Sequence, residues 1–277
     1  MPTSYRHKSR LTLGEGNDKP ISILLIGAGG NGSLLLGHLA RIHTALVRSR
    51  IHPPGLHVTV IDDDLVSEAN LGRQAFSPAD LGQPKATVLV SRINLFYGTQ
   101  WEALFGRFNT TTFGIVEARS IVISCVDTIK SRLSVASVLR KCRVYWMDLG
   151  NTATTGQVVL GESEGYFKKG FDGTYPERKH RLPHLFDLYP TMRRMKDRAT
   201  EPSCSLIEAL AKQDLFINST LANFAGQLLW QLFRHGGLNH QGAFVNLTTG
   251  RVVPIYVPEF KPDPSDPSLL INLLVSK

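Results

Sequence analysis

The sequence predicts an α/β protein with a Rossmann-like fold: a mostly parallel, doubly wound sheet with a long crossover loop and a C-terminal helix and hairpin. Two observations lead to this prediction. Short apolar runs alternate with segments of helical character from about residue 20 to about residue 160, which is typical of a parallel sheet covered on both faces. The first run is followed by Gly-Ala-Gly-Gly-Asn-Gly at residues 27–32 and then by an apolar helix. Strand, glycine turn and helix form the setting in which this motif indicates a nucleotide site.

Three glycines of this turn have different expected roles. Gly27 suits a tight turn, Gly29 allows the backbone to approach a phosphate, and Gly32 allows the helix to pack close to the strand. Free backbone N–H groups and the helix dipole then face the ligand. The motif alone does not choose among NAD, FAD and ATP.

The other elements follow from apolar runs and breaker residues. The strand before the turn, residues 21–26, has five apolar residues among six, and the helix after the turn runs to about residue 50. The second strand, residues 56–61, ends in three aspartates, at the strand edge where open α/β sheets bind ligands. We expect further strands at 101–105, 120–125 and 144–149, further helices at 84–96 and 130–141, and a loop that enters a strand at 150–160.

The chain is expected to form one nucleotide-binding domain with an N-terminal arm, a crossover loop and a C-terminal tail. Its divisions are an N-terminal arm (1–19), an adenylation core (20–162), a crossover loop or lid (163–204), a C-terminal helix and hairpin that complete the same domain (205–257), and a tail (258–277). The crossover is interpreted as a loop because it shows little periodicity, and loops of this length are usually functional or disordered. The helix is expected at 215–234 and the hairpin at 242–257, with its turn near 248–250.

Composition narrows the function classes. The chain has 277 residues, a formal charge of +8 and a pI of about 9.5, but its basic residues are scattered and no DNA-recognition pattern accompanies them. Nucleic-acid binding is therefore not expected. The positive electrostatic field of the basic residues could instead steer an acidic protein partner. No apolar run is long enough to span a bilayer and residues 1–19 lack an apolar signal core, so we expect a cytoplasmic protein. Three cysteines without a CxxC pair argue against a disulfide framework or a closed zinc site.

The stretch from Asp62 to Lys85 separates the nucleotide classes. A dehydrogenase needs one acid at the end of the second strand, and Asp62 meets that need. A polyphosphate also needs cations, which Arg73 and Lys85 can supply. A Mg²⁺ ion that bridges phosphates needs a hard oxygen ligand, and Asp127 follows the buried strand at 120–125.

Each of these residues also has a structural interpretation. Arg73 and Lys85 taken singly read as surface charges, and Asp127 could cap the helix after it. Asp64 could cap a turn as readily as touch a ligand. Asp63 and Glu68 are interpreted as solvated surface, and the nine histidines form no cluster with metal-ligand spacing.

Four motifs resemble those of the ThiF/MoeB/HesA family, which includes the ubiquitin-activating enzymes. They are Val-Ile-Asp-Asp-Asp-Leu-Val at 60–66, Asn-Leu-Gly-Arg-Gln at 70–74, Gly-Gln-Pro-Lys-Ala at 82–86, and Cys-Val-Asp-Thr at 125–128 with Arg132. The order and spacing match from about residue 21 to residue 160. The stretch 203–222 is similar to the ThiF-like proteins of bacterial PRTRC systems, which are encoded beside a small ubiquitin-like protein.

The resemblance implies ATP and Mg²⁺ as ligands. Asp62 would hold the ribose, with Asp64 and the glycine turn (Gly27, Gly29, Gly30 and Gly32) beside the nucleotide. The phosphate-binding set that it implies consists of Asn70, Arg73 and Lys85, with Gln74 supporting Arg73. Asp127 would bind the metal.

The resemblance also implies a reaction, which is adenylation of the C-terminal glycine carboxylate of a small ubiquitin-like protein. Relatives pass the adenylate to a cysteine after the crossover, where Cys204 stands. If Ser203 or Ser205 caps a helix, Cys204 lies near the helix N-terminus, where the pKa of a thiol is lowered; otherwise it is a small residue in a turn. Cys125 and Cys142 are interpreted as a strand residue and a helix-end residue.

Two departures from the family pattern matter. The paired CxxC motifs that bind zinc in many relatives are absent from this sequence, so zinc is not expected. Relatives also place an arginine near the N-terminus, which often reaches the partner subunit's site. Arg6 and Arg10 are the candidates here, and the sequence does not choose between them.

We therefore hypothesise an ATP-dependent adenylating enzyme that forms a homodimer and has a ubiquitin-like substrate and a possible downstream conjugating protein. One alternative is a noncatalytic scaffold that binds a nucleotide or a ubiquitin-like protein. Such a scaffold has no need for Arg73, Lys85 and Asp127 together. A second alternative is an NAD-dependent oxidoreductase, which Asp62 fits but which leaves residues 70–74 unexplained.

Overall fold

The computed structural model describes residues 6–9, 11, 13, 14, 16–109, 120–140, 143–163, 181–197 and 205–258. Its centre is an eight-stranded sheet in the order β10-β9-β7-β6-β5-β2-β3-β4. Neighbouring strands from β6 to β4 run parallel, whereas β7, β9 and β10 extend the β6 side in antiparallel fashion. The strands are β2 (Ile21–Ile26), β3 (Leu56–Asp62), β4 (Glu102–Phe105), β5 (Ser120–Ser124), β6 (Tyr145–Asn151), β7 (Thr155–Glu162), β9 (His240–Asn246) and β10 (Arg251–Tyr256).

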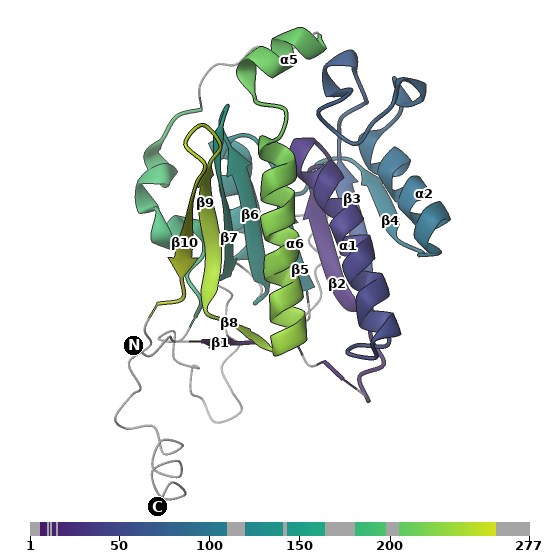
Figure 1. The fold of residues 1–277 in the computed structure, drawn as a ribbon, viewed down its shortest axis with the longest axis vertical. Coiled ribbons are helices and arrows are strands. Elements are labelled where there is room, and N and C mark those ends of the chain that lie inside the picture. Colours follow the sequence, from purple (N-terminus) through teal and green to yellow (C-terminus); the bar gives the residue numbers. More distant parts are fainter. Residues whose placement is uncertain are drawn as a thin grey trace, which may run out of the picture.

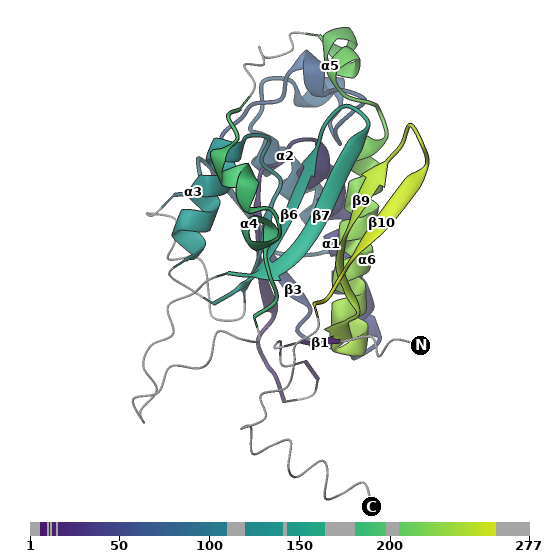
Figure 2. The ribbon, with the colours of Figure 1, turned by 90° about the vertical axis from the view of Figure 1, so that its left-hand side faces the viewer.

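Helices cover both faces of the sheet (Figures 1 and 2). On one face lie α1 (Gly30–Arg48), α2 (Lys85–Tyr97) and α6 (Ile217–His235), and on the other lie α3 (Ile129–Leu139) and the short α4 (Leu185–Leu188). Successive side chains of β2 explain the two layers: Ile23 and Leu25 enter the larger core, whereas Leu24 and Ile26 enter the smaller one. This alternation is what a strand requires when both faces of its sheet are buried. The predicted doubly wound Rossmann-like architecture is confirmed.

Two segments differ from the sequence prediction. Within the expected crossover loop, residues 181–197 form α4 and a 3-10 turn at Pro190–Arg194, and Leu182, Leu185 and Phe186 are buried against the sheet. A helix of four residues is too short to show periodicity in a sequence. The run 150–160 is not simply a loop that leads into a strand, because β6 and β7 form an antiparallel hairpin across it.

The described part of the N-terminal arm is fixed at the end of the molecule away from the carboxyl ends of the parallel strands. The strand β1 (His7–Lys8) pairs with β8 (Gly237–Leu238), just after α6. His7 Nε2 lies 2.8 Å from the buried Tyr145 hydroxyl, and the Arg6 guanidinium donates to the carbonyl of His235. At this end Gly236 terminates α6 with a φ of 60°, as the glycine pair in the sequence indicates.

The predicted C-terminal elements are present. Helix α6 packs against α1 on the outer face of the sheet (Figure 1), and β9 and β10 form the expected hairpin. The short helix α5 (Leu206–Lys212) precedes α6 and lies beyond the carboxyl ends of the parallel strands (Figure 1). No helix in the described ranges combines the length and apolar character that a bilayer crossing requires.

Candidate functional site

A cavity of about 710 Å³ lies where the parallel strands end. The final residues of β2, β3 and β6 line it, together with the residues that follow β4 and β5. Open α/β sheets bind their ligands at this edge. The structure brings nine of the predicted site residues to this cavity: Gly27, Gly29, Gly30, Asp62, Asp64, Arg73, Gln74, Lys85 and Asp127. Gly32 and Asn70 do not line it, and Cys204 and Arg10 lie outside the described residues.

The glycine turn is shaped by close approaches of the backbone. Gly27 has a φ of +91°, which is the left-handed region that favours glycine. A Cβ on Gly32 would lie 1.9 Å from the Gly27 carbonyl oxygen, whereas a Cβ on Gly29 would meet no atom within 4 Å. The absence of a side chain therefore has a packing reason at Gly32 and leaves open space at Gly29.

Three helices begin at the cavity. The first residues of α1 (Gly30 and Asn31), of α3 (Lys130 and Ser131) and of α6 (Asn218) line it. A helix N-terminus presents unpaired N–H groups and the positive end of the helix dipole. Asp197 and Thr128 already accept from the first N–H groups of α3, so the N-termini of α1 and α6 are the ends that favour an anionic ligand.

Asp62, the last residue of β3, bridges two backbone segments at the cavity. One carboxylate oxygen accepts from Ala28 N at 2.6 Å and the other from Asp64 N at 2.8 Å. Burial raises the pKa of Asp62, and the two backbone hydrogen bonds partly oppose that rise. The carboxylate is thus fixed beside the glycine turn.

The two predicted phosphate-binding cations lie beside the cavity, Lys85 buried and Arg73 half-buried. Lys85 Nζ lies 2.7 Å from Asp64 Oδ2, and the Lys85 side chain is only 7% exposed. Arg73 Nη1 donates to Gln213 Oε1, while Arg73 Nε is buried and has no hydrogen-bond partner. Burial lowers the pKa of Arg73, yet an arginine remains protonated in proteins. An anion in the cavity would therefore find two positive charges, one with an unpaired N–H.

Asn70 and Gln74 occupy places that the sequence interpretation did not anticipate. Asn70 Oδ1 accepts from the backbone N and hydroxyl of Ser67, at 2.9 and 3.1 Å, and closes a 3-10 turn (Glu68–Asn70). The Asn70 side chain thus shapes the loop that carries Arg73. Gln74 lines the cavity, and its Oε1 is buried without a partner. Gln213, which no sequence motif identified, holds the position next to Arg73.

Asp127 does not cap helix α3, which was the structural alternative to metal binding. Thr128 is the N-cap of α3, and its hydroxyl oxygen accepts from Ser131 N at 3.1 Å. Asp197 from the crossover segment accepts from Ile129 N at 2.5 Å and from Lys130 N at 3.1 Å. Because these two residues satisfy the first turn, the exposed Asp127 carboxylate is available at the cavity wall.

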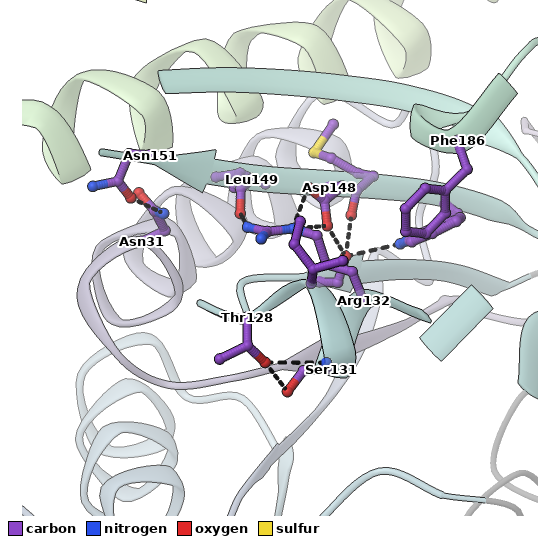
Figure 3. Close-up of polar contacts among 12 residues, drawn as sticks. Asn31, Thr128, Ser131, Arg132, Asp148, Leu149, Asn151 and Phe186 are labelled. Atoms are coloured by element: carbon purple, nitrogen blue, oxygen red, sulfur yellow. Dashed lines mark hydrogen bonds and ion pairs between the residues drawn. The ribbon is translucent and has the colours of Figure 1, made fainter. Parts of the chain in front are cut away.

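The β6 side of the cavity is a wall that sequence reasoning mostly missed (Figure 3). Arg132 was part of the 125–128 motif, and it pairs with the buried Asp148 of β6. Beside this pair, Asn31 Nδ2 donates to Asn151 Oδ1 at 3.0 Å. Asp148 lies in the strand predicted at 144–149, whereas Asn151 falls in the run 150–160 that was expected to begin as a loop. In the structure Asn151 ends β6, as Asp62 ends β3. On the β4 side, Arg107 and Asp63 form an ion pair at the rim, and both residues are exposed, in agreement with the interpretation of Asp63 as solvated surface.

Arg6 does not reach the cavity of its own chain. It bonds to the last residue of α6, whereas Asn218, near the start of that helix, lines the cavity. The helix has 19 residues, which corresponds to a length of roughly 28 Å.

A family model described as the ThiF family matches residues 18–246. The chain belongs to the ThiF family. This membership confirms the resemblance seen in the four sequence motifs. Within the described residues, no group of three or more His, Cys, Asp or Glu side chains could hold a metal ion.

The ThiF-family chain is also similar to individual proteins. It is 30% identical over 109 residues to the adenylyltransferase and sulfurtransferase UBA4 of Yarrowia lipolytica, a match that covers 38% of this chain and 24% of UBA4. The chain thus spans about a quarter of that relative.

Two solved structures share its fold. For PaaA the TM-score is 0.56 at 16% identity, covering 87% of this chain and 64% of PaaA. For E. coli MccB, crystallised with MccA, the TM-score is 0.54 at 14% identity, covering 89% of this chain and 66% of MccB.

Proposed function

We propose that this ThiF-family chain uses ATP to adenylate the C-terminal glycine carboxylate of a small ubiquitin-like protein and releases pyrophosphate. The observation that carries the proposal is the placement of Arg73, Lys85 and Asp127 around one cavity with the glycine turn. A site for a neutral ligand has no need of one buried cation, one half-buried cation and a carboxylate. The relative UBA4 is named as an adenylyltransferase, which supports the same reaction.

The reaction places particular demands on the site. A carboxylate oxygen of the substrate attacks the α-phosphorus of ATP, a new C(O)O–P bond forms, and the bond from that phosphorus to the pyrophosphate oxygen breaks. No proton transfer is required, so alignment and charge neutralisation matter more than a general base. Arg73 and Lys85 neutralise the phosphates, and the N-termini of α1 and α6 add partial positive charge.

The residues at the cavity fit a nucleotide with Mg²⁺. The open space at Gly29 leaves room for a phosphate beside backbone N–H groups, and the unpaired Arg73 Nε has a donor to offer. Asp127 is the residue that would hold Mg²⁺, and a single protein carboxylate suits an ion that is otherwise bound by phosphates and water. The ion would neutralise negative charge on the phosphates. Asp62 would accept hydrogen bonds from the ribose.

The acyl group is proposed to pass from the adenylate to Cys204: the thiol loses its proton, its sulfur forms a thioester bond with the acyl carbon, and the bond from that carbon to the phosphate oxygen breaks so that AMP leaves. Cys204 lies outside the described residues, but Ser205 beside it is the N-cap of α5, with its hydroxyl oxygen 3.3 Å from Glu208 N. We also propose a homodimer, in which an N-terminal arginine of one subunit serves the other.

Calorimetry with ATP·Mg and with NAD tests the proposal without a known substrate. We expect ATP·Mg to bind wild type, and Asp127→Ala and Lys85→Ala each to weaken binding. The matched controls Asp18→Ala and Lys19→Ala change exposed residues before β2 and should bind as wild type does. Binding of NAD with indifference to ATP would overturn the proposal. ATP·Mg binding that neither Asp127→Ala nor Lys85→Ala weakens would also contradict it.

A further inference from the structure

The cavity has a wall of carboxamides that nucleotide binding does not use. Asn31 on α1, Asn151 at the end of β6, and Gln213 and Asn218 near the start of α6 all line the cavity. Asn31 is 7% exposed and Asn218 is 1% exposed. Buried carboxamides are normally fully hydrogen-bonded, so an exception indicates a missing partner.

Asn31 Oδ1 is that exception. It is buried and has no hydrogen-bond partner. The orientation of its amide follows from a chain of contacts: Asn151 Nδ2 donates to the Thr152 carbonyl at 3.0 Å, so Asn151 Oδ1 must face Asn31 and accept from Asn31 Nδ2 at 3.0 Å. The remaining atom of Asn31 is therefore an acceptor, and it requires a donor from a ligand.

The position of Asn31 indicates which part of the ligand supplies the donor. The proposed ribose partner, Asp62, ends β3, whereas Asn151 ends β6, three strands away in the sheet. Three strand spacings are about 14 Å. The glycine turn that would hold the phosphates follows β2, between these two strands. The β6 side is therefore the side left for the acyl substrate.

The chemistry of the donor agrees with this position. Phosphate oxygens at neutral pH accept hydrogen bonds and cannot satisfy a carboxamide oxygen. A peptide ending in a carboxylate has an N–H on its terminal residue, two bonds from the reacting carboxyl carbon. We propose that Asn31 Oδ1 accepts a hydrogen bond from this terminal main-chain N–H. Asn31 is then a specificity-determining residue, and Asn151 is the positioning residue that orients it.

This inference rests on the proposed adenylation and can be tested separately from it. The probes are 5′-sulfamoyladenosine, its glycyl-glycyl derivative, and the glycyl-sarcosyl derivative, in which the terminal amide N–H is replaced by N-methyl. All three contain adenosine, but only the glycyl-glycyl derivative has the N–H in question. Binding is measured by calorimetry with the full chain.

Wild type should bind the glycyl-glycyl probe about tenfold more tightly than the glycyl-sarcosyl probe, the value of one net hydrogen bond. Asn31→Ala should lose this preference while binding 5′-sulfamoyladenosine as wild type does, and Asn151→Ala should reduce the preference. The control Asn239→Ala changes an exposed carboxamide next to β8 and should keep it.

The outcomes separate the two proposals. If wild type binds none of the probes, the proposed function fails. If wild type binds them and Asn31→Ala retains the same preference, or wild type shows none, the role of Asn31 is wrong. If Asn31→Ala fails to bind 5′-sulfamoyladenosine, the test passes to Asn151→Ala. An undiminished preference of Asn151→Ala for the glycyl-glycyl probe over the glycyl-sarcosyl probe then overturns the inference.

Discussion

Arg132 Nε donates to both carboxylate oxygens of Asp148, at 3.1 and 3.2 Å, in an ion pair whose side chains are 7% and 1% exposed. Figure 3 shows the pair with its neighbouring polar contacts, and Arg132 also lines the cavity. The Ser124 hydroxyl donates to Asp148 at 2.6 Å, and the Trp146 indole N–H donates to Ser124 Oγ at 2.8 Å. The Asp148 carboxylate thus accepts hydrogen bonds from both Arg132 and Ser124, and the ion pair joins α3 to β6.

Removal of one partner should destabilise the fold strongly. Asp148→Ala leaves the buried Arg132 without a counterion, and we expect the free energy of unfolding to fall by about 3–5 kcal/mol. Urea denaturation followed by circular dichroism measures this loss. The control Arg92→Ala breaks a more exposed pair with Asp80 and should cost far less. Equal midpoints for Asp148→Ala and wild type would show that the pair does not stabilise the fold.

Two glycines of the same turn should respond differently to alanine. Gly32→Ala places a Cβ 1.9 Å from the Gly27 carbonyl oxygen, so we expect a lower melting temperature. Gly29→Ala meets open space, so the fold should keep its melting temperature while ATP·Mg binding weakens because the methyl group occupies the phosphate position. Melting curves and calorimetry on both variants check this. If Gly29→Ala bound ATP·Mg normally, the phosphates would not lie at this turn.

Asp127 and Thr128 are neighbours with separable effects. Thr128→Ala removes the N-cap of α3 and should cost about 1 kcal/mol of stability. Asp127→Ala should leave stability nearly unchanged, since the side chain is exposed, but should reduce the Mg²⁺ dependence of ATP binding. Calorimetry with and without Mg²⁺, beside urea denaturation, distinguishes the two. A loss of stability in Asp127→Ala equal to that of Thr128→Ala would favour a structural role for Asp127.

Nucleoside binding should weaken in acid. Burial raises the pKa of Asp62, so its carboxylate gains a proton at a higher pH than an ordinary aspartate. The protonated form is the poorer acceptor for ribose hydroxyls, and affinity should therefore fall as the pH drops from 7 through the raised pKa. Because the probe 5′-sulfamoyladenosine has no phosphate that titrates, a change in its affinity with pH reports on groups of the protein. Asp62→Asn should bind weakly at every pH and lack this step; an unchanged step in Asp62→Asn would assign it to another group.

Cys204 has a test of its own. Cys204→Ala should leave adenylate formation intact while abolishing any reducible adduct with the substrate protein. Burial raises the pKa of the Cys125 thiol, so Cys125 should be a poor nucleophile. Cys125→Ala is therefore the matched control, and it should keep the adduct. Non-reducing electrophoresis with and without thiol detects the adduct, and an adduct that survives in Cys204→Ala would remove Cys204 from the mechanism.

The sequence alone predicted that the β2–α1 turn, Asp62 and the cations that follow it belong to one ligand site. These residues lie within about 65 positions of one another; the glycine turn, Asp62 and Lys85 each end or begin an element with strong apolar patterning, whereas Arg73 lies in the loop between Asp62 and Lys85. Their convergence follows from the rule that parallel strands end at one edge of a sheet. Asp127 was found in the same way, after the buried strand at 120–125, and the family motifs then added Arg132.

The remainder depends on contacts that no local pattern shows. Gln213 bonds to Arg73 across 140 positions, and Asn218 packs beside Gly30; neither lies in the four motifs. The resemblance implied a role for Asn70 in phosphate binding, and in the structure its side-chain oxygen closes a turn with Ser67. The segment at 181–197, with its buried residues Leu182, Leu185 and Phe186, was also missed, because four helical residues cannot display a helical period.

The position of β7, β9 and α6 in the chain has a consequence for synthesis on the ribosome. When the nascent chain has emerged only as far as Asn151, the parallel strands are complete but their outer edge at β6 is unpaired. The apolar face of α1 also lacks α6, and Arg73 lacks Gln213. The cavity at the carboxyl ends of the parallel strands is therefore complete only when the chain as far as residue 218 has emerged. The unpaired sheet edge and the uncovered helix face invite association with other chains. Strand β7 and helix α6, which are made later, are the intramolecular covers of that edge and that face.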